Sequence, residues 1–389
     1  MQQNQTSLWA RLSAFPRPVW ILFFGTFLNK FGTFVIPFLA LYMTRQGYST
    51  AQAGIAMGAY GAGNFLASGL GGHLADVLGR RKTIVVSMFS GALTMMLLSQ
   101  ARSFPAIVLL TGLAGLAGEF YRPASSALLA DLVPPGQRVT AYSGYRMAFN
   151  AGWAFGPATA GFLAGHSYFW LFAGDAATSV LFGIVAWVAL PHGVRTTKSQ
   201  AGWRPALRAV SRDHRFLRML AASGTMTLVF MQMASTFGLY VTGNGFSPAT
   251  YGALISFNGV LVVLCELPLT TITQRFPPRR ILAAGFLLVG AGFAANAFAH
   301  TIPVFVLVVF IFTLGEMTSA PVSAAYVADL APVELRGRYM GVMGFSSALA
   351  VVAGPGLGMA LLARNPTALW ALCGGLGCLA ATIISSGKD

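Results

Sequence analysis

Charged side chains are scarce in this sequence. Asp, Glu, Lys and Arg make up only 9% of its 389 residues, whereas 56% of the residues are hydrophobic. Soluble domains carry roughly 25% charged residues, so a water-soluble fold of this length could not bury so much apolar side chain. The composition therefore excludes a soluble domain and predicts an integral membrane protein.

Cysteine is nearly absent, and no catalytic arrangement is found. Cys265, Cys373 and Cys378 lie in apolar segments without the spacing of metal ligands, so we interpret them as small hydrophobic residues. The five histidines are scattered at predicted helix ends or in loops, with no Ser-His-Asp or metal-ligand cluster. The first 16 residues lack the apolar core of a cleavable signal. We therefore expect no enzyme activity, no metal and no cofactor.

Acidic residues are also few: ten stand against 25 Lys and Arg, which gives a net charge of +15. We assign 19 of the 25 cations to one side of a membrane, three to the other side (Arg45, Arg102 and Arg364) and three to helix interiors. This asymmetry follows the positive-inside rule. It predicts a multi-pass protein of a bacterial-type cytoplasmic (inner) membrane, with both termini in the cytoplasm and no nucleic-acid partner.

Twelve apolar segments are long enough to cross a bilayer, since a helical span needs about 20 residues. A polar, basic stretch separates the sixth from the seventh, and its part from Trp203 to Arg212 is predicted to form a short helix on the membrane surface. We therefore predict six-helix bundles at 1–190 and 216–389, joined by a cytoplasmic linker at 191–215. The predicted spans are 18–44, 50–76, 83–101, 106–132, 139–165, 168–190, 216–243, 249–275, 281–299, 303–330, 337–363 and 367–386.

The two halves repeat each other at an offset of 198 residues. The run LYMTRQGYST at Leu41–Thr50 returns as LYVTGNGFSP at Leu239–Pro248, and Gly156-Pro157 returns as Gly354-Pro355. Six spans per half is an even number, so both halves enter the membrane in the same orientation. The sequence thus predicts an all-α membrane protein of twelve transmembrane helices in two parallel six-helix repeats.

Several ionisable residues lie inside the predicted spans, where a charge costs about 2.5–3.5 kcal/mol on insertion scales and normally faces a cavity or a partner. Glu119 and Glu316 lie 12 to 13 residues from an Asp at the cytoplasmic end of their helices, near the bilayer midplane. Burial favours the neutral form of a carboxyl group, which is what proton coupling requires. Glu316 has no cation nearby in the sequence. Glu119 could instead form a static ion pair with Lys30 or Arg122.

Two further acidic residues in the spans fit more than one interpretation. Glu266 is a third candidate for proton coupling, although it lies nine residues before Arg275 and could reach water at a helix end. Asp175 lies about seven residues from the outer end of its predicted span, so it could also reach water.

Two motifs carry a resemblance to a known family. The run Gly72–Lys82 has the spacing G-x-x-x-D-x-x-G-R-R, and Asn150–Gly161 contains G-x-x-x-G-P-x-x-x-G. The first resembles the loop between helices 2 and 3 of major facilitator superfamily transporters, and the second resembles the motif of their drug:proton antiporters. The chain departs from that pattern at Val77, where a cation usually stands, and at 109–112, which lacks an arginine.

The resemblance implies alternating access, with helices 1, 4, 7 and 10 around a central cavity. It implies proton-driven export of small lipophilic molecules by a monomer in the lipid bilayer, with the proton gradient as the energy source and no cofactor. Residues expected at the substrate cavity are Lys30, Asn29, Phe34, Arg122, Arg146, Asn150, Met233 and Phe237. Residues expected to pack helices 5 and 11 closely are Gly152, Gly156, Pro157, Gly354 and Pro355.

Two other functions remain open at this point. A proton-coupled carrier of a defined metabolite (a sugar, peptide or organic anion), importing or exporting, would use Lys30 as a counter-charge. A non-transporting receptor on a carrier fold would have no use for midplane carboxylates, whose insertion is costly.

The loop motif itself predicts a conformational latch, formed by Gly72, Asp76, Gly79, Arg80, Arg81 and Asp131. We expect Asp76 to cap the positive end of the eleventh helix near Gly337–Gly341, and Arg80 to pair with Asp131. Both contacts would hold the outward-open state and break as the halves rock apart.

Overall fold

The computed structural model describes residues 15–134, 137–192, 204–330 and 336–386, apart from the side chains of a few residues within these ranges. In these ranges the chain forms helices and no strand, so the predicted all-α fold is confirmed. The first half comprises α2 (Arg17–Phe31), α3 (Val35–Arg45), α4 (Thr50–Val77), α5 (Arg80–Gln100), α6 (Phe104–Glu119), α7 (Tyr121–Leu132), α8 (Arg138–His166) and α9 (Phe169–Ala189). After α10 (Arg204–Arg212), the second half comprises α11 (His214–Ser235), α12 (Phe237–Gly243), α13 (Pro248–Thr273), α14 (Pro278–Ala295), α15 (Ile302–Leu330), α16 (Arg336–Arg364) and α17 (Pro366–Ser385).

These helices make six spans before α10 and six after it within the described ranges. Nine spans are single helices, and three consist of two consecutive helices: α2 with α3, α6 with α7, and α11 with α12. The predicted first, fourth and seventh spans therefore each contain a break between two helices, which the sequence analysis did not predict. At the first break the N–H of Phe34 donates to the carbonyl of Gly32 at 2.7 Å, a turn too tight to continue an α-helix.

Ten of the described spans are long and apolar enough to cross a membrane by themselves, and α4 and α8 are not among them. Both are rich in glycine and polar residues. They are also the helices through which the first half packs on the second, α4 against α16 and α8 against α13. Small residues allow helices in a membrane to approach closely, so these two spans carry fewer of the large apolar side chains that face lipid.

Local signals in the sequence set several helix boundaries. Ser49 and Gln52 form a capping box at the start of α4, and Asp213 caps α11 by accepting from two backbone N–H groups. Between α4 and α5 the chain turns at Gly79, whose φ of 94° lies in the left-handed region that favours glycine. The predicted loop motif therefore forms a tight turn because of this glycine.

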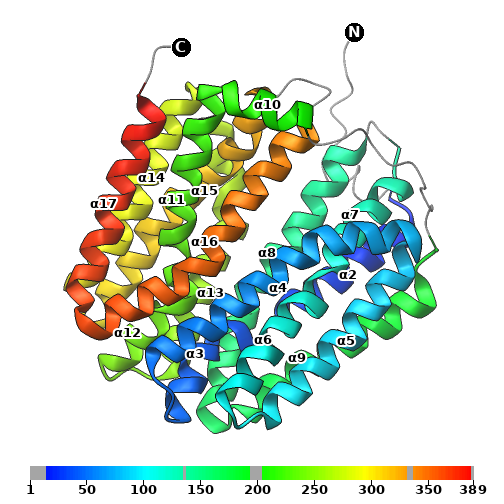
Figure 1. Ribbon diagram of the computed structural model, residues 1–389, viewed down its shortest axis with the longest axis horizontal. Coiled ribbons are helices and arrows are strands. Elements are labelled where there is room, and N and C mark those ends of the chain that lie inside the picture. The colour runs from blue at the N-terminus through cyan, green and yellow to red at the C-terminus, as the bar shows by residue number, and fades with distance from the viewer. Residues whose placement is uncertain (1–14, 135–136, 193–203, 331–335, 387–389) are drawn as a thin grey trace.

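The first six spans lie on the right of Figure 1 and the last six on the left, with α10 at one end of the molecule (the α10 end) and α3 and α12 at the opposite end (the α12 end). The halves touch at the α12 end. A Cβ on Gly54 would lie 2.8 Å from the Cα of Gly356, and α3 contacts α12. Farther along α4, a Cβ on Gly69 or Gly72 would meet nothing within 4 Å. The halves are therefore closed together at the α12 end and separate toward the α10 end.

Candidate functional site

A buried ion-pair cluster lies in the middle of the first half. The ammonium of Lys30 on α2 lies 2.8 Å from Oε1 of Glu119 at the end of α6, and their side chains are only 4% and 7% exposed. The hydroxyl of Tyr60 on α4 donates to the same oxygen at 3.2 Å. Arg122 contacts the other oxygen of Glu119 at 3.5 Å, although its side chain is 49% exposed. Two cations thus neutralise Glu119.

Aromatic rings complete this cluster. The ammonium of Lys30 lies 5.2 Å from the ring centroid of Phe149 and 5.7 Å from that of Tyr121, and Arg122 lies 5.3 Å from the Phe149 ring. A cation within about 6 Å of a ring centroid is attracted to the ring face. These contacts help to hold both cations inside the bilayer.

A second ion pair connects the two halves. The guanidinium of Arg146 on α8 contacts the carboxylate of Glu266 on α13. Glu266 is mostly buried, whereas Arg146 is about half exposed. The sequence singled out both residues but not the pair, because they are 120 positions apart. The ion pair joins helices of opposite halves, so a movement of one half relative to the other would change its geometry.

Glu316 has different surroundings. It lies on α15, fourteen residues from each end of the helix. The side-chain amide of Asn258 on α13 donates to Oε2 of Glu316 at 2.9 Å and to the hydroxyl of Thr313 at 2.9 Å. In the part of the chain that the structure describes, no Lys or Arg pairs with Glu316. Its carboxyl group therefore has a neutral partner.

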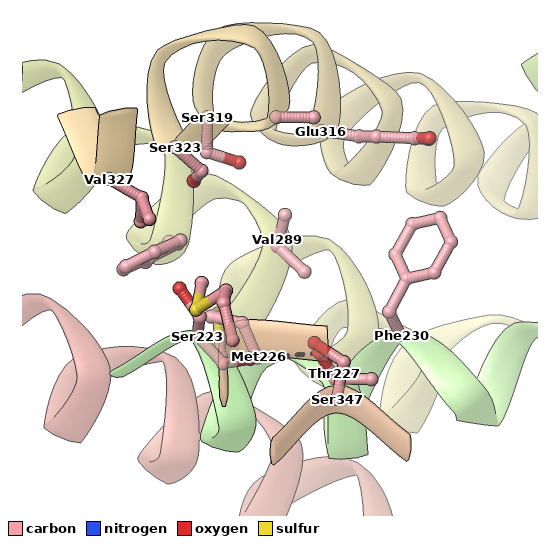
Figure 2. A pocket seen from close by; sticks show the side chains of 13 residues that line it. Ser223, Met226, Thr227, Phe230, Val289, Glu316, Ser319, Ser323, Val327 and Ser347 are labelled. Carbon is pink, nitrogen blue, oxygen red and sulfur yellow. Dashed lines mark hydrogen bonds between the residues drawn. The ribbon is translucent and has the colours of Figure 1, made fainter. Parts of the chain in front are cut away.

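Glu316 lines a cavity of about 380 Å³ in the second half. Figure 2 shows Glu316, Ser319 and Ser323 of α15 on one side and Ser223, Met226, Thr227 and Phe230 of α11 on the other. Apolar and small hydroxyl side chains alternate around it. The remaining lining residues are Phe286, Val289, Ala320, Val327, Met343 and Ser347.

The spacing of the residues that line this cavity is a local signal in the sequence. Glu316, Ser319 and Ser323 recur at intervals of three and four residues, as do Ser223, Thr227 and Phe230, so each set lies on one helix face. Asn258 could not be found in this way, since its contact with Glu316 spans 58 positions.

The other residues expected at the substrate cavity lie elsewhere. Met233 and Phe237 are buried at the α12 end, where the ring of Phe237 packs on Tyr251 at a centroid distance of 6.0 Å. Phe34 is buried at the break between α2 and α3. Asn150 is partly buried on α8. The structure therefore brings neither these residues nor the Lys30 cluster into contact with the described cavity.

Asn29, also expected at the substrate cavity, is buried in the first half. Its side-chain amide donates to the sulfur of Met88 at 3.7 Å. It lines a small separate cavity together with Tyr60, Glu119 and Asp175. Asp175 is 7% exposed, so the interpretation that it reaches water at a helix end is wrong.

The glycines and prolines of the two packing motifs lie at close helix contacts. A Cβ on Gly152 would lie 2.7 Å from the Cβ of Lys30, and one on Gly156 would lie 2.5 Å from the carbonyl of Phe31. These two glycines let α8 approach α2, so they also hold Lys30 in place. The carbonyl of Pro157 faces Gly252 on α13, Gly354 faces Met231, and the carbonyl of Pro355 faces Gly54.

The expected latch is present only in part. Nε of Arg80 lies 3.3 Å from the carboxylate of Asp131, as predicted, and Arg81 donates to the carbonyl of Leu190 at 3.2 Å. Both contacts join helices of the first half. The Arg80–Asp131 pair is intact in this structure, in which the halves separate at the same end of the molecule. The side chain of Asp76 lies outside the described residues, as do those at positions 337, 338, 340 and 341 of the stretch that it was expected to cap.

Comparison with known proteins identifies the family to which this chain is similar. The family model of the Major Facilitator Superfamily matches residues 22–264 and 235–386. An uncharacterized MFS-type transporter of Bacillus subtilis, YqjV, is 30% identical over 87% of this chain and 85% of its own length. The multidrug resistance protein MdtH of Aeromonas hydrophila is 27% identical over 92% of each chain. Among solved structures, a peptide transporter in complex with sulfate superposes with a TM-score of 0.78 at 19% identity, covering 95% of this chain and 94% of that one.

Proposed function

The chain belongs to the major facilitator superfamily of secondary transporters, and we propose that it exports small lipophilic molecules in exchange for protons. One observation carries this proposal: Glu316, at the middle of a span, lines a largely apolar cavity and has the neutral Asn258 as its partner. A carboxyl group in such surroundings can change its charge without breaking an ion pair. A proton and a cationic or neutral lipophilic molecule can therefore compete for the same site.

The cavity has the chemistry of a site for varied apolar molecules. Its walls include the flexible side chains of Met226 and Met343 and the aromatic rings of Phe230 and Phe286. Methionine adapts its shape to different partners, and binding sites for small molecules are mostly apolar with a few polar groups. The relative MdtH, a multidrug resistance protein by name, supports the same substrate class.

We place the α10 end in the cytoplasm. The cations near that end include Arg80, Arg81, Arg212, Arg279 and Arg280, whereas the opposite end has Arg45, Arg102 and Arg364. Positively charged loops stay on the cytoplasmic side. With this orientation the structure corresponds to an inward-facing state, in which substrate would enter the cavity from the cytoplasm or the inner leaflet.

The transport cycle then follows from exchange at Glu316. Substrate would bind the inward-facing state as the proton leaves Glu316, and the halves would rock about the contacts of α4 with α16 and of α8 with α13. Outside, protonation of Glu316 would displace the substrate and allow the return. The Lys30 cluster would act as a rigid support for the first half during this movement.

The metabolite carrier is the second candidate, and the burial and pairing of Lys30 argue against it. Lys30 was expected to serve as counter-charge to an anion, but its ammonium is held by Glu119 at 2.8 Å and is buried. Binding an anion there would require breaking a buried ion pair, which costs several kcal/mol.

The test is transport in proteoliposomes with an imposed pH gradient of either sign. The substrate panel contains lipophilic cations, neutral lipophilic compounds, organic anions, small peptides and alkali cations. We expect gradient-driven export of lipophilic cations or neutral compounds, and its loss in Glu316→Gln, while exchange of labelled for unlabelled substrate without a gradient persists. Asp329→Asn is the matched control, because it makes the same change from carboxylate to amide at an exposed position of the same helix, outside the cavity. Full gradient-driven transport by Glu316→Gln would contradict the assignment of Glu316 as the proton-coupling residue. Transport of anions alone would favour the metabolite carrier.

A further inference from the structure

Asp175 is a buried carboxyl group with no part in the mechanism above. It lies on α9 in the first half, is 7% exposed, and its Oδ2 has no hydrogen-bond partner among the described residues. None of the ion pairs found in the described residues includes it. An ionised carboxylate kept in this way inside a protein has a large desolvation cost, so its surroundings must offset that cost or the group must bind a proton.

The surroundings of Asp175 are the break in the first membrane span. Asp175 lies at the start of α3, since Thr33 and Ile36 line the same small cavity and a Cβ on the neighbouring Gly174 would lie 2.8 Å from the ring of Phe34. The first N–H groups of a helix lack partners within the helix, and a negative charge beside them is stabilised by the helix dipole. Phe34 occupies the N-cap position and has no polar side chain to cap α3. Asp175 therefore supplies from α9 the anion that the helix start lacks.

A small cavity connects Asp175 to the ion-pair cluster. Its volume is about 20 Å³, enough for roughly one water molecule. Asn29 lines it as well, is 8% exposed, and its Oδ1 also has no partner among the described residues. The titratable and charged groups that face Asp175 here are Lys30 from α2, Tyr60 from α4 and Glu119 from α6. Two oxygens without partners and room for one water molecule provide a place for a proton to arrive and be held.

The repeat shows that this arrangement belongs to one half only. The residue 198 positions after Asp175 is Cys373, which is buried on α17. The corresponding break, between α11 and α12, lies near Gln232, whose side chain contacts the hydroxyls of Ser235 and Thr236 at 3.4 and 3.0 Å. The second half thus uses a neutral amide beside its break, whereas the first half uses an acid.

We propose that Asp175 is a second proton-binding site, and that its charge stabilises the break between α2 and α3 and, through α3, the closure of the α12 end. The step is the uptake of one proton by the carboxylate from water and its later return to water. Ionised Asp175 holds the start of α3 in place. Protonation removes the charge that stabilises the helix start and loosens α3.

The connection from α3 to the closed end is direct. The carbonyl of Pro37 on α3 accepts a hydrogen bond from Tyr251 of the second half at 3.1 Å, and α3 contacts α12. This inference rests on the proposed proton-coupled export. An exporter that exchanges substrate for protons must prevent the empty carrier from changing between its inward-facing and outward-facing states. An ionised Asp175 has this effect because it keeps the α12 end closed.

The experiment measures closure of the α12 end without transport. Spin labels are placed at the exposed positions Gln46 and Thr367, in a variant that lacks the three native cysteines and carries Glu316→Gln so that Glu316 does not titrate, and their distance is measured at acid and alkaline pH. We expect the distance to lengthen at acid pH in the otherwise native protein. Asp175→Asn should give the long distance at both pH values. Ser179→Ala, which alters the same cavity without changing charge, should behave as the native protein.

A second measurement counts protons directly. After a pH jump, the unlabelled Asp175→Asn variant should take up about one proton fewer than the native protein, as read by a pH-sensitive dye. Equal proton uptake, or a distance in Asp175→Asn that still changes with pH, overturns the proposal. If Asp175→Asn does not fold, Asp175→Ser is used, and failure of both variants to fold identifies Asp175 as a purely structural cap. Neither readout involves substrate, so both remain interpretable whatever transport by Glu316→Gln shows.

Discussion

The hydroxyl of Tyr251, on α13 of the second half, lies 3.1 Å from the carbonyl oxygen of Pro37 on α3 of the first half and 3.1 Å from that of Met233 on α11. Tyr251 is completely buried, and its ring packs edge-to-face on Phe38 at a centroid distance of 5.2 Å. A single side chain thus ties a helix of each half to α13 at the closed end.

Removing this hydroxyl is expected to loosen the closed end. A buried hydrogen bond contributes about 1 kcal/mol net, which corresponds to about a fivefold change in a population ratio. Tyr251→Phe keeps the ring and should shift the distance between spin labels at Gln46 and Thr367 toward the open population by that factor. Tyr326→Phe on α15, far from this end, should leave the distribution unchanged. An unaltered distribution in Tyr251→Phe would show that ring packing alone closes the end.

The Lys30–Glu119 pair is expected to stabilise the first half. Truncating one partner of a buried ion pair costs about 3–5 kcal/mol, because the other charge stays buried. Lys30→Met should therefore lower the thermal unfolding temperature strongly, and Lys30→Met with Glu119→Gln should lower it less than the sum of the two single changes. Arg122→Ala should cost less than Lys30→Met, since Arg122 is 49% exposed. Thermal unfolding in detergent measures all four variants, and strict additivity would contradict the pairing.

Two glycines of α4 provide a matched test of the contact between the halves. A Cβ on Gly58 would lie 2.8 Å from the carbonyl oxygen of Val352 on α16, whereas one on Gly69 would meet nothing within 4 Å. Overpacking a tight contact costs about 1–3 kcal/mol. Gly58→Ala should therefore push the halves apart at the α12 end and lengthen the distance between labels at Gln46 and Thr367. Gly69→Ala, with the same change in helix propensity, should not. Equal effects of the two changes would refute the role of this contact.

Exchange of charges tests the ion pair between α8 and α13. Arg146→Glu and Glu266→Arg each place two like charges together and should impair gradient-driven transport in proteoliposomes. The double variant restores the pair in reverse and should recover most of the activity. Should the double variant remain as inactive as the singles, Glu266 would have a role beyond pairing, such as the proton binding expected from its position in the sequence.

Much of the architecture could be predicted from local sequence features. Apolar runs of about 20 residues mark helices that cross a membrane, and the 198-residue repeat predicted that the same set of spans occurs twice. Glycine positions predicted close helix contacts at Gly152 and Gly156, because only glycine lets two backbones approach so closely. The Arg80–Asp131 pair could also be predicted, since both residues belong to charged helix ends on the same side of the membrane.

The sequence by itself thus determined the helices, their order and the scarcity of buried charge, because each depends on residues close together in the chain. Only the tertiary structure decided which charges meet. It paired Lys30 with Glu119 and Arg146 with Glu266, gave Glu316 the neutral partner Asn258, and brought Asp175 to the break in the first span. Such partners lie 58 to 141 positions apart. Helix packing brings them together, and a charge inside a bilayer takes its role from what surrounds it.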